Sequence, residues 1–391
     1  MQAVTDRVSE VFKEVVEWRR HLHANPELSY HEGKTSQFIY DTLVSIGGLE
    51  VTRPTKYSVM AKLKGGQPGP VLGIHAHMNA LPIKEDTGLD YKSTVDGVMH
   101  ACGHDGHTAM LLGTVKILLS MREQIKGEVR FFFQHAEGFF SGGAPEVVEE
   151  GGMEGVDTVI AAHLIITQEV GTFGIAYGPT MAAPDGFYLT VKGKCDAGIG
   201  MPHDTIDSIA IGAQVVTNLQ QVISNTTNPL EPAMLSIGKF IGGEAMNVIV
   251  NSVEISATIR TFNKEVREEM PTLIERVVKD ITEAHGATYE LEYLTGYEPV
   301  INDYKKAAVM ENVIIGLYGE ECFARFAPNM WAQDFSAFMR NTPGCYFFIG
   351  AGNKEKGIVY PHHHPKFDID EEGMRYAMEI LVEAVFAYNN V

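Results

Sequence analysis

The chain has 391 residues, of which 45% are hydrophobic and 21% are charged, and its formal net charge at pH 7 is −19. A chain of this length exceeds what one hydrophobic core usually holds, so we expect two domains. So acidic a surface repels nucleic acid and anionic membranes, which excludes both as partners. The sequence also contains no apolar run long enough for a transmembrane helix.

The start of the chain and its cysteines indicate the compartment. The first ten residues are amphipathic and acidic, and they lack the basic and apolar regions of a signal peptide. The four cysteines are scattered along the chain, which favours reduced thiols over a disulfide framework. We therefore expect a cytoplasmic protein.

Hydrophobic spacing predicts helices and strands that alternate along the first part of the chain. We expect two helices within residues 8–47, then strand 71–75, helix 108–121, strand 127–134 and strand 158–163. This alternation predicts an α/β domain built on a layered sheet with crossover connections. Ligands of such sheets bind beyond the carboxyl ends of the strands, where His75, Glu137 and His163 fall.

The middle of the chain changes to the order strand, helix, strand, strand, helix, strand, which is the split pattern of a ferredoxin-like unit. The elements are expected at 187–191, 206–223, 234–240, 253–262, 266–285 and 289–294. The chain then returns to the first domain, with helices at 305–318 and 371–388 and a strand at 344–349. We predict a catalytic domain in two parts, 1–184 and 297–391, and an inserted domain at 185–296.

Thiol, imidazole and carboxylate side chains gather near the predicted strand ends. Cys102 and His104 are two residues apart, and both residue types are good ligands for zinc and similar ions. An isolated Cys-Gly-His stretch would favour a buried thiol before a helix, but His163 and the histidines at 362–364 shift the balance towards a metal site. Glu137 could be the general base, although a loop glutamate alone would not indicate this.

Longer motifs carry a resemblance to a known family. They include Arg-Arg-His-Leu-His-Ala-Asn-Pro-Glu-Leu at 19–28, Met-His-Ala-Cys-Gly-His-Asp-Gly-His at 99–107 and His-His-Pro-Lys-Phe-Asp at 363–368. On these the chain resembles, nearly end to end, the aminoacylase, hippurate hydrolase and indole-acetyl-amino-acid hydrolase branch of the carboxypeptidase G type metallopeptidases. The resemblance implies an α/β catalytic domain, phosphorylase/hydrolase-like, whose mixed sheet has helices on both faces. It also implies that the inserted α+β domain is a lid that forms a homodimer.

The same resemblance implies roles for individual residues. Divalent metal ions, one or two per subunit and usually zinc, manganese, nickel or cobalt, would be held by Cys102, His104, His163 and His363. Glu137 occupies the position of the catalytic base. Asn247 and Arg260 match lid positions associated with substrate binding.

Several positions depart from the family pattern. Gly138 replaces a metal-binding glutamate, and His135, a candidate substrate contact, replaces a proline. The stretch His-Ala-His-Met-Asn at 75–79 replaces Arg-x-Asp-x-Asp, which makes His75 and His77 further candidate ligands. The lid histidine of the family falls on Ala197 or Gly198, and Gln333 replaces a glutamate.

Three functional hypotheses follow. The first is a metal-dependent hydrolase that cleaves an amide-type C–N bond of a small N-acyl amino acid or aromatic amide, with water activated by the metal and by Glu137. The second is a remodelled hydrolase of another C–N bond that uses one metal, for example in the deamination of an aromatic amino acid-like substrate. The third is an inactive homologue that binds a small molecule. The added histidines favour a remodelled site over random loss of ligands.

Overall fold

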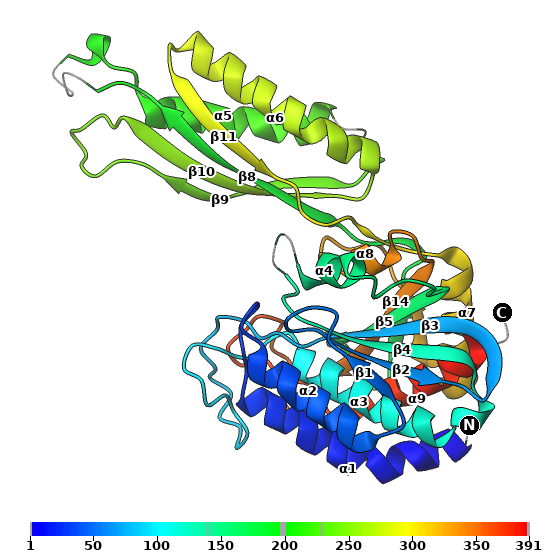
Figure 1. Ribbon diagram of the computed structural model, residues 1–391. Coiled ribbons are helices and arrows are strands. Elements are labelled where there is room, and N and C mark those ends of the chain that lie inside the picture. Colours follow the sequence, from blue (N-terminus) through cyan, green and yellow to red (C-terminus); the bar gives the residue numbers. More distant parts are fainter. Residues whose placement is uncertain are drawn as a thin grey trace. The chain divides into compact units, whose positions relative to one another are not determined.

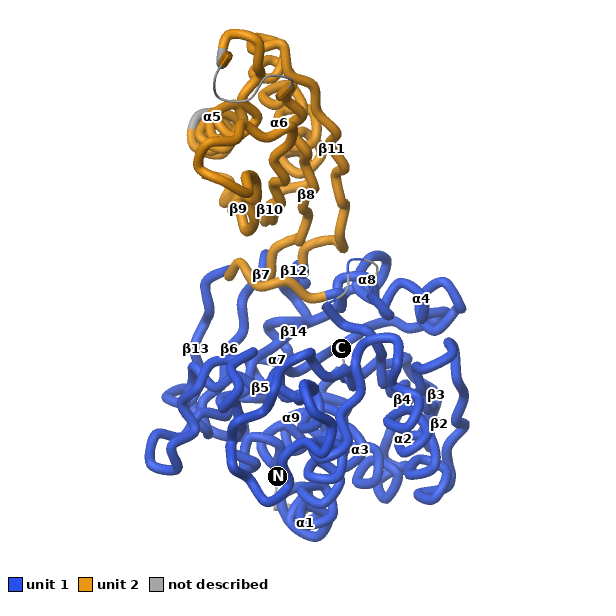
Figure 2. The backbone as a smooth tube through the Cα atoms, turned by 90° about the vertical axis from the view of Figure 1, so that its left-hand side faces the viewer, with its two compact units in different colours: residues 1–180, 300–328, 334–391 blue, residues 181–299, 329–333 orange. Residues whose placement is uncertain are grey.

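The computed structural model describes residues 2–138, 140, 142–195, 201–226, 228 and 230–388. It divides into two compact units, which Figure 2 shows in different colours. Unit 1 comprises residues 1–180, 300–328 and 334–391, and unit 2 comprises residues 181–299 and 329–333. The predicted insertion at 185–296 lies within the longer segment of unit 2.

Within the described residues, unit 1 is built on an eight-stranded sheet in the order β1-β2-β4-β3-β5-β14-β6-β13 (Figure 1). The strands are β1 Glu50–Thr52, β2 Val59–Lys64, β3 Gln67–His77, β4 Lys126–Gln134, β5 Thr158–Glu169, β6 Phe173–Ile175, β13 Phe323–Arg325 and β14 Gly344–Gly352. A separate pair is formed by β7 Gly178–Met181 and β12 Val300–Asn302. The central strands β4, β3, β5 and β14 are parallel, and β2 and β1 are antiparallel additions. The carboxyl ends of the central strands therefore meet at one edge of a mixed sheet, as the α/β prediction requires.

Helix α3 begins in the Cys-Gly-His motif at that edge. It connects β3 to β4 and contacts both strands as well as β5. Nearly all of its residues are buried because Met110, Leu111, Leu112 and Val115 make it apolar all round, which is typical of a core helix. The helices of unit 1 are α1 Gln2–Ala24, α2 Gly33–Ile46, α3 His104–Ser120, α4 Gly143–Glu149, α7 Tyr304–Tyr318, α8 Ser336–Met339 and α9 Glu372–Tyr388, with short turns η1 Arg122–Gln124 and η4 Glu320–Cys322.

Unit 2 has its own sheet and its own hydrophobic core. Its elements are β8 Ala183–Lys192, α5 Ser208–Gln221, β9 Ala233–Ile241, β10 Ser252–Thr261, α6 Lys264–Ala284 and β11 Thr288–Leu294, with η2 Pro202–Asp204 and η3 Val222–Thr226. The strands pair antiparallel in the order β11-β8-β10-β9. Each helix buries one apolar stripe, and Asp207 and Asn263 cap their N-termini through side-chain oxygens. The described helices of both units include none that is long and apolar enough to cross a membrane.

A buried guanidinium ties three parts of unit 1 together beside the N-terminus of α3. Arg19 on α1 is fully buried, and it donates hydrogen bonds to Asp105 at 2.9 Å, Asp368 at 2.6 Å and Glu371 at 3.2 Å. Burial alone would raise the pKa of Asp105, but Arg19 and His23 hold it well below its ordinary value. Asp105 is therefore charged, and α1, the first turn of α3 and the segment before α9 are held in one network.

Replacement of Arg19 by methionine is expected to destabilise unit 1 by about 3–5 kcal/mol, because it leaves the buried carboxylate of Asp105 without the charge of Arg19. Urea unfolding followed by tryptophan fluorescence measures this loss. Arg20→Met is the matched control, since Arg20 also binds Glu371 but its side chain is 47% exposed. The control should lose less than about 1 kcal/mol. Equal losses in the two variants would contradict a special role for the buried network.

Candidate metal centre

The Cys-Gly-His motif folds into a tight turn that leads into α3. Gly103 has a φ of +83°, a left-handed conformation that glycine adopts without strain. One donor atom each from Cys102, His104 and His163 lie within 4.8 Å of one another. The Sγ atom of Cys102 is 3.7 Å from Nε2 of His163, which comes from β5. Three of the four ligands expected from the family resemblance are thus side by side.

The hydrogen bonds of the two imidazoles leave one nitrogen of each ring available. Nδ1 of His104 lies 2.9 Å from the carbonyl oxygen of Asn79, and Nδ1 of His163 lies 2.9 Å from that of Leu164. A carbonyl oxygen can only accept, so each Nδ1 carries the proton and each Nε2 carries the lone pair. Burial lowers the pKa of His163 to about 4 and that of His104 well below its ordinary value. Both rings are therefore neutral and in the tautomer that binds cations through Nε2.

The donor set fits a divalent cation. Nε2 of His104 is buried and has no hydrogen-bond partner among the residues that the structure describes, so its lone pair is available to a cation. Burial raises the pKa of the Cys102 thiol well above its ordinary value, and the charges of Glu137 and Asp105 add to this effect. A cation against Sγ would reverse that shift by stabilising the thiolate. One sulfur and two nitrogen donors suit zinc and similar ions, and three protein ligands leave a coordination position open.

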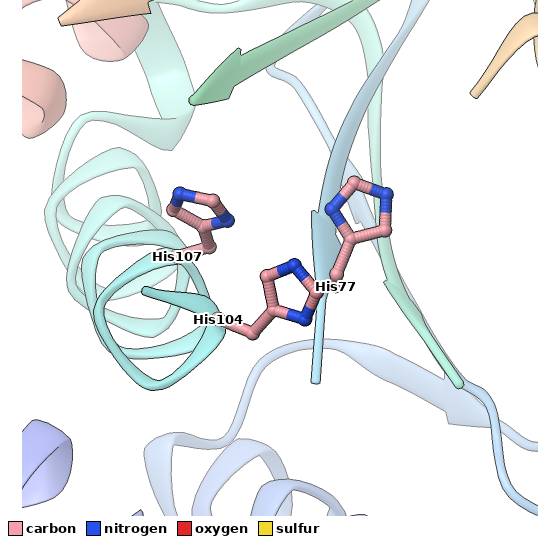
Figure 3. A group of neighbouring side chains, drawn as sticks. All are labelled: His77, His104 and His107. Atoms are coloured by element: carbon pink, nitrogen blue, oxygen red, sulfur yellow. The ribbon is translucent and has the colours of Figure 1, made fainter. Parts of the chain in front are cut away.

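A second group of imidazoles lies next to the first and shares His104. Figure 3 shows the rings of His77, His104 and His107, whose donor atoms also lie within 4.8 Å of one another. The main-chain N–H of Leu164 donates to Nε2 of His107 at 3.0 Å. The lone pair of His107 is therefore used, and in the neutral ring its proton sits on Nδ1. Nε2 of His107 is therefore already occupied by a hydrogen bond and does not face this group as a free ligand atom.

Two carboxyl groups lie close to these imidazoles. Oε2 of Glu137, beyond the end of β4, is 3.7 Å from Nε2 of His104. Oδ1 of Asp334 is 3.8 Å from Nε2 of His77, and its Oδ2 accepts a 2.7 Å hydrogen bond from Gln134. Burial raises the pKa of both groups, that of Asp334 to about 7, and the charge of Asp334 further raises that of Glu137. Asp334 was missed by the sequence analysis as a site residue because it precedes a short helix without any periodic signal.

Three other histidines of unit 1 that were predicted as site residues lie outside both donor groups. Nε2 of His75 donates to Oε1 of Gln134 at 2.7 Å, so this ring is turned towards the amide. His135 is buried, with Nδ1 2.7 Å from the Ser58 hydroxyl and Nε2 3.3 Å from Glu146. The main-chain N–H of His363, at a φ of +67°, donates to the carbonyl of Ala101 beside Cys102.

The remaining positions named in the sequence analysis are Gly138 in unit 1 and several residues of unit 2. Gly138 has a φ of +85°, and a Cβ atom there would meet nothing within 4 Å, so no carboxylate comes from this position. Arg260 on β10 donates to Oγ1 of Thr258 at 2.7 Å and to the carbonyl of Ile259 at 3.1 Å. Asn247 is exposed in the loop that follows β9. Ala197 and Gly198, where the lid histidine was expected, lie outside the described residues.

Comparisons with known proteins agree with this architecture. Residues 73–387 match the model of Peptidase family M20/M25/M40. The N-acyl-L-amino acid amidohydrolase of Geobacillus stearothermophilus is 58% identical over 295 residues, which are 75% of this chain and 80% of that protein. The N-acetylcysteine deacetylase of Bacillus subtilis (strain 168) is 36% identical over 371 residues, which are 94% of this chain and 95% of that protein.

Two crystal structures share the fold of the chain. A putative aminohydrolase from methicillin resistant Staphylococcus aureus has a TM-score of 0.91 at 32% identity, over 99% of both chains. The YxeP protein of Bacillus subtilis, named a dinuclear metal binding peptidase, has a TM-score of 0.83 at 33% identity over 98% of this chain and 99% of that one. These findings confirm the family resemblance and the α/β fold class of the catalytic domain. The chain belongs to Peptidase family M20/M25/M40.

Proposed function

We propose that the chain is a metal-dependent amidohydrolase that cleaves the amide bond of a small N-acyl amino acid. The observation that carries the proposal is the group of Cys102, His104 and His163, with the Glu137 carboxyl group 3.7 Å from Nε2 of His104. The relatives support the substrate class, because one is named an N-acyl-L-amino acid amidohydrolase and another an N-acetylcysteine deacetylase.

In this proposal the residues of the chain bind the substrate and move one proton. A divalent cation in the site would supply Lewis acidity and make a water molecule more acidic. Oε2 of Glu137 would take the proton of the attacking water and return it to the nitrogen of the departing amino acid. Arg260, Asn247 and His135 are the predicted substrate contacts, and a guanidinium such as that of Arg260 is suited to a substrate carboxylate.

A panel of N-acetyl, N-benzoyl and indole-acetyl amino acids tests this function. The purified chain, supplied separately with zinc, manganese, nickel or cobalt, should release the free amino acid from at least one member of the panel. A chelator should abolish the release, and the ion that restores it best identifies the preferred metal. Failure with every substrate and every ion would refute the proposal and favour an inactive binding protein.

We further propose that each chain holds one cation and not two. Two observations support this number. The lone pair on Nε2 of His107 accepts a hydrogen bond from the main-chain N–H of Leu164, and Gly138 stands where a glutamate ligand was expected. Elemental analysis of the dialysed protein is therefore expected to find about one tightly bound ion per chain, consistent with an open catalytic site of three protein ligands. Two tightly bound ions per chain would contradict the single-cation centre and leave the proposed reaction intact.

For unit 2 we propose the role of lid and dimerisation domain in a cytoplasmic homodimer. The family resemblance supports this role, and so does strand β9 at the edge of its sheet, where Phe240 and Ile241 are exposed. An exposed apolar edge strand is an efficient template for pairing with another chain. Analytical ultracentrifugation that finds the mass of a single chain at micromolar concentration would contradict the dimer.

A further inference from the structure

We propose that Asn79 is a positioning residue that fixes the main chain of Glu137 by two reciprocal hydrogen bonds. The main-chain N–H of Glu137 donates to Oδ1 of Asn79 at 3.1 Å, and Nδ2 of Asn79 donates to the carbonyl oxygen of Glu137 at 3.0 Å. Asn79 is 1% exposed and follows β3, while Glu137 follows the neighbouring parallel strand β4. The inference rests on the proposed role of Glu137 as the base.

The loop that carries Glu137 needs such support because it has no regular secondary structure. Ala136, immediately before the base, has a φ of +54°, a left-handed conformation that is uncommon for a residue with a side chain. Its main-chain N–H donates to Oε1 of the buried Glu32 at 2.7 Å. Two consecutive N–H groups of the loop are therefore held by buried side chains from elsewhere in the chain. A strained backbone conformation persists where the surrounding structure holds it in place, and here the hydrogen bonds to Glu32 and Asn79 do so.

The amide of Asn79 is the chemical group that this contact requires. An asparagine side chain both accepts and donates, whereas an ionised aspartate only accepts. An aspartate at this position would present an oxygen to the carbonyl of Glu137. It would also bring another negative charge close to the base. The amide of Asn79 therefore allows a two-way contact with the Glu137 main chain.

Asn79 also contacts the metal centre, but through a different group. Its main-chain carbonyl accepts the hydrogen bond from Nδ1 of His104 at 2.9 Å. A substitution of the side chain leaves this carbonyl in place. The position of the base and the binding of the cation can therefore be separated by experiment.

Asn79→Ala and Asn79→Asp test the inference in the full chain, with the best substrate of the panel. We expect kcat to fall about tenfold to hundredfold, since a displacement of about 1 Å in a catalytic group can cost this much. KM and the metal content should stay close to those of the wild type, and both variants should remain folded, with a lower melting temperature because buried hydrogen bonds are lost. Ser29→Ala is the matched control, because it removes only the 3.2 Å hydrogen bond between Nδ2 of Asn79 and the Ser29 hydroxyl. Its kcat should equal that of the wild type.

Three outcomes would overturn the inference while the proposed function stands: an unchanged kcat in both variants, a rise in KM alone, or a loss of metal in proportion to the loss of rate. The last would indicate a merely structural role. Failure of the proposed function gives a different pattern, because the wild type would be inactive or Glu137→Gln would be active. Either of these would remove the base that Asn79 is inferred to hold.

Discussion

Glu137→Gln is expected to lower kcat about 10²–10⁴-fold while the protein stays folded and keeps its metal. This is the usual range for the loss of a general base. Glutamine has the shape of the protonated acid and retains no basic oxygen. Burial and the neighbouring Asp334 raise the pKa of Glu137, which favours the neutral form of the acid, and a neutral glutamine of the same shape should fit without strain.

Steady-state hydrolysis, elemental analysis and thermal unfolding of this variant give the three quantities needed. Glu149→Gln is the matched control, since Glu149 is an exposed acid at the end of α4, later in the same stretch of chain. It should hydrolyse substrate at the wild-type rate. A Glu137→Gln variant that retains most of its kcat would show that another group takes the proton. Asp334 would then be the next candidate, because its carboxyl group lies beside His77.

Cys102→Ser is expected to weaken metal binding by more than about a hundredfold and to abolish hydrolysis at ordinary metal concentrations. Mutation of a residue that only hydrogen-bonds to a ligand typically lowers metal affinity about 10–100-fold, so loss of a thiolate ligand should lower it more. The hydroxyl of serine is a far poorer ligand than a thiolate for zinc-like ions. The protein loaded with cobalt should also lose the sulfur-to-cobalt charge-transfer absorption, which reports the Cys102 ligand directly.

Cys322→Ser is the matched control, because Cys322 is a free, half-buried thiol in η4 that belongs to neither donor group. Its metal affinity and its cobalt spectrum should match those of the wild type. Titration with a chelating indicator measures the affinity of both variants. If Cys102→Ser bound metal as tightly as the control, the thiol would not be a ligand, and the site would have to be rebuilt from the imidazoles alone.

Long elements with a regular pattern could be predicted from the sequence, and short ones could not. Strand β4 and helix α6 were expected close to their observed bounds, and α6 continues through Pro271. Strands β6, β12 and β13 have three residues each and show no periodicity. Their existence depends on partners far along the chain, such as the parallel pairing of β13 with β6. Segment 329–333 joins unit 2 for the same reason, without any sequence signal.

The grouping of the candidate ligands was predictable where they lie close together in the sequence. It was not predictable where hydrogen bonds decide which ring nitrogen is free. Cys102 and His104 flank one glycine, and their spacing together with His163 and the histidines at 362–364 predicted a shared metal ion. His75 and His77 have the same spacing, yet only the ring of His77 joins a donor group, because His75 is turned towards Gln134. The sequence shows which histidines lie at a strand end, but it does not show which of their ring nitrogens faces the site. Asp334 reaches Gln134 across 200 positions, a contact that no local pattern indicates.

The acceptors that orient His104 and His163 are main-chain oxygens, and this protects the centre against mutation. Every amino acid brings the same carbonyl group, so substitutions at Asn79 and Leu164 leave the proton on Nδ1 and the free electron pair on Nε2. Relatives of this chain could therefore exchange the residues around the cation, and with them the substrate they accept, while the ligands keep their chemical form.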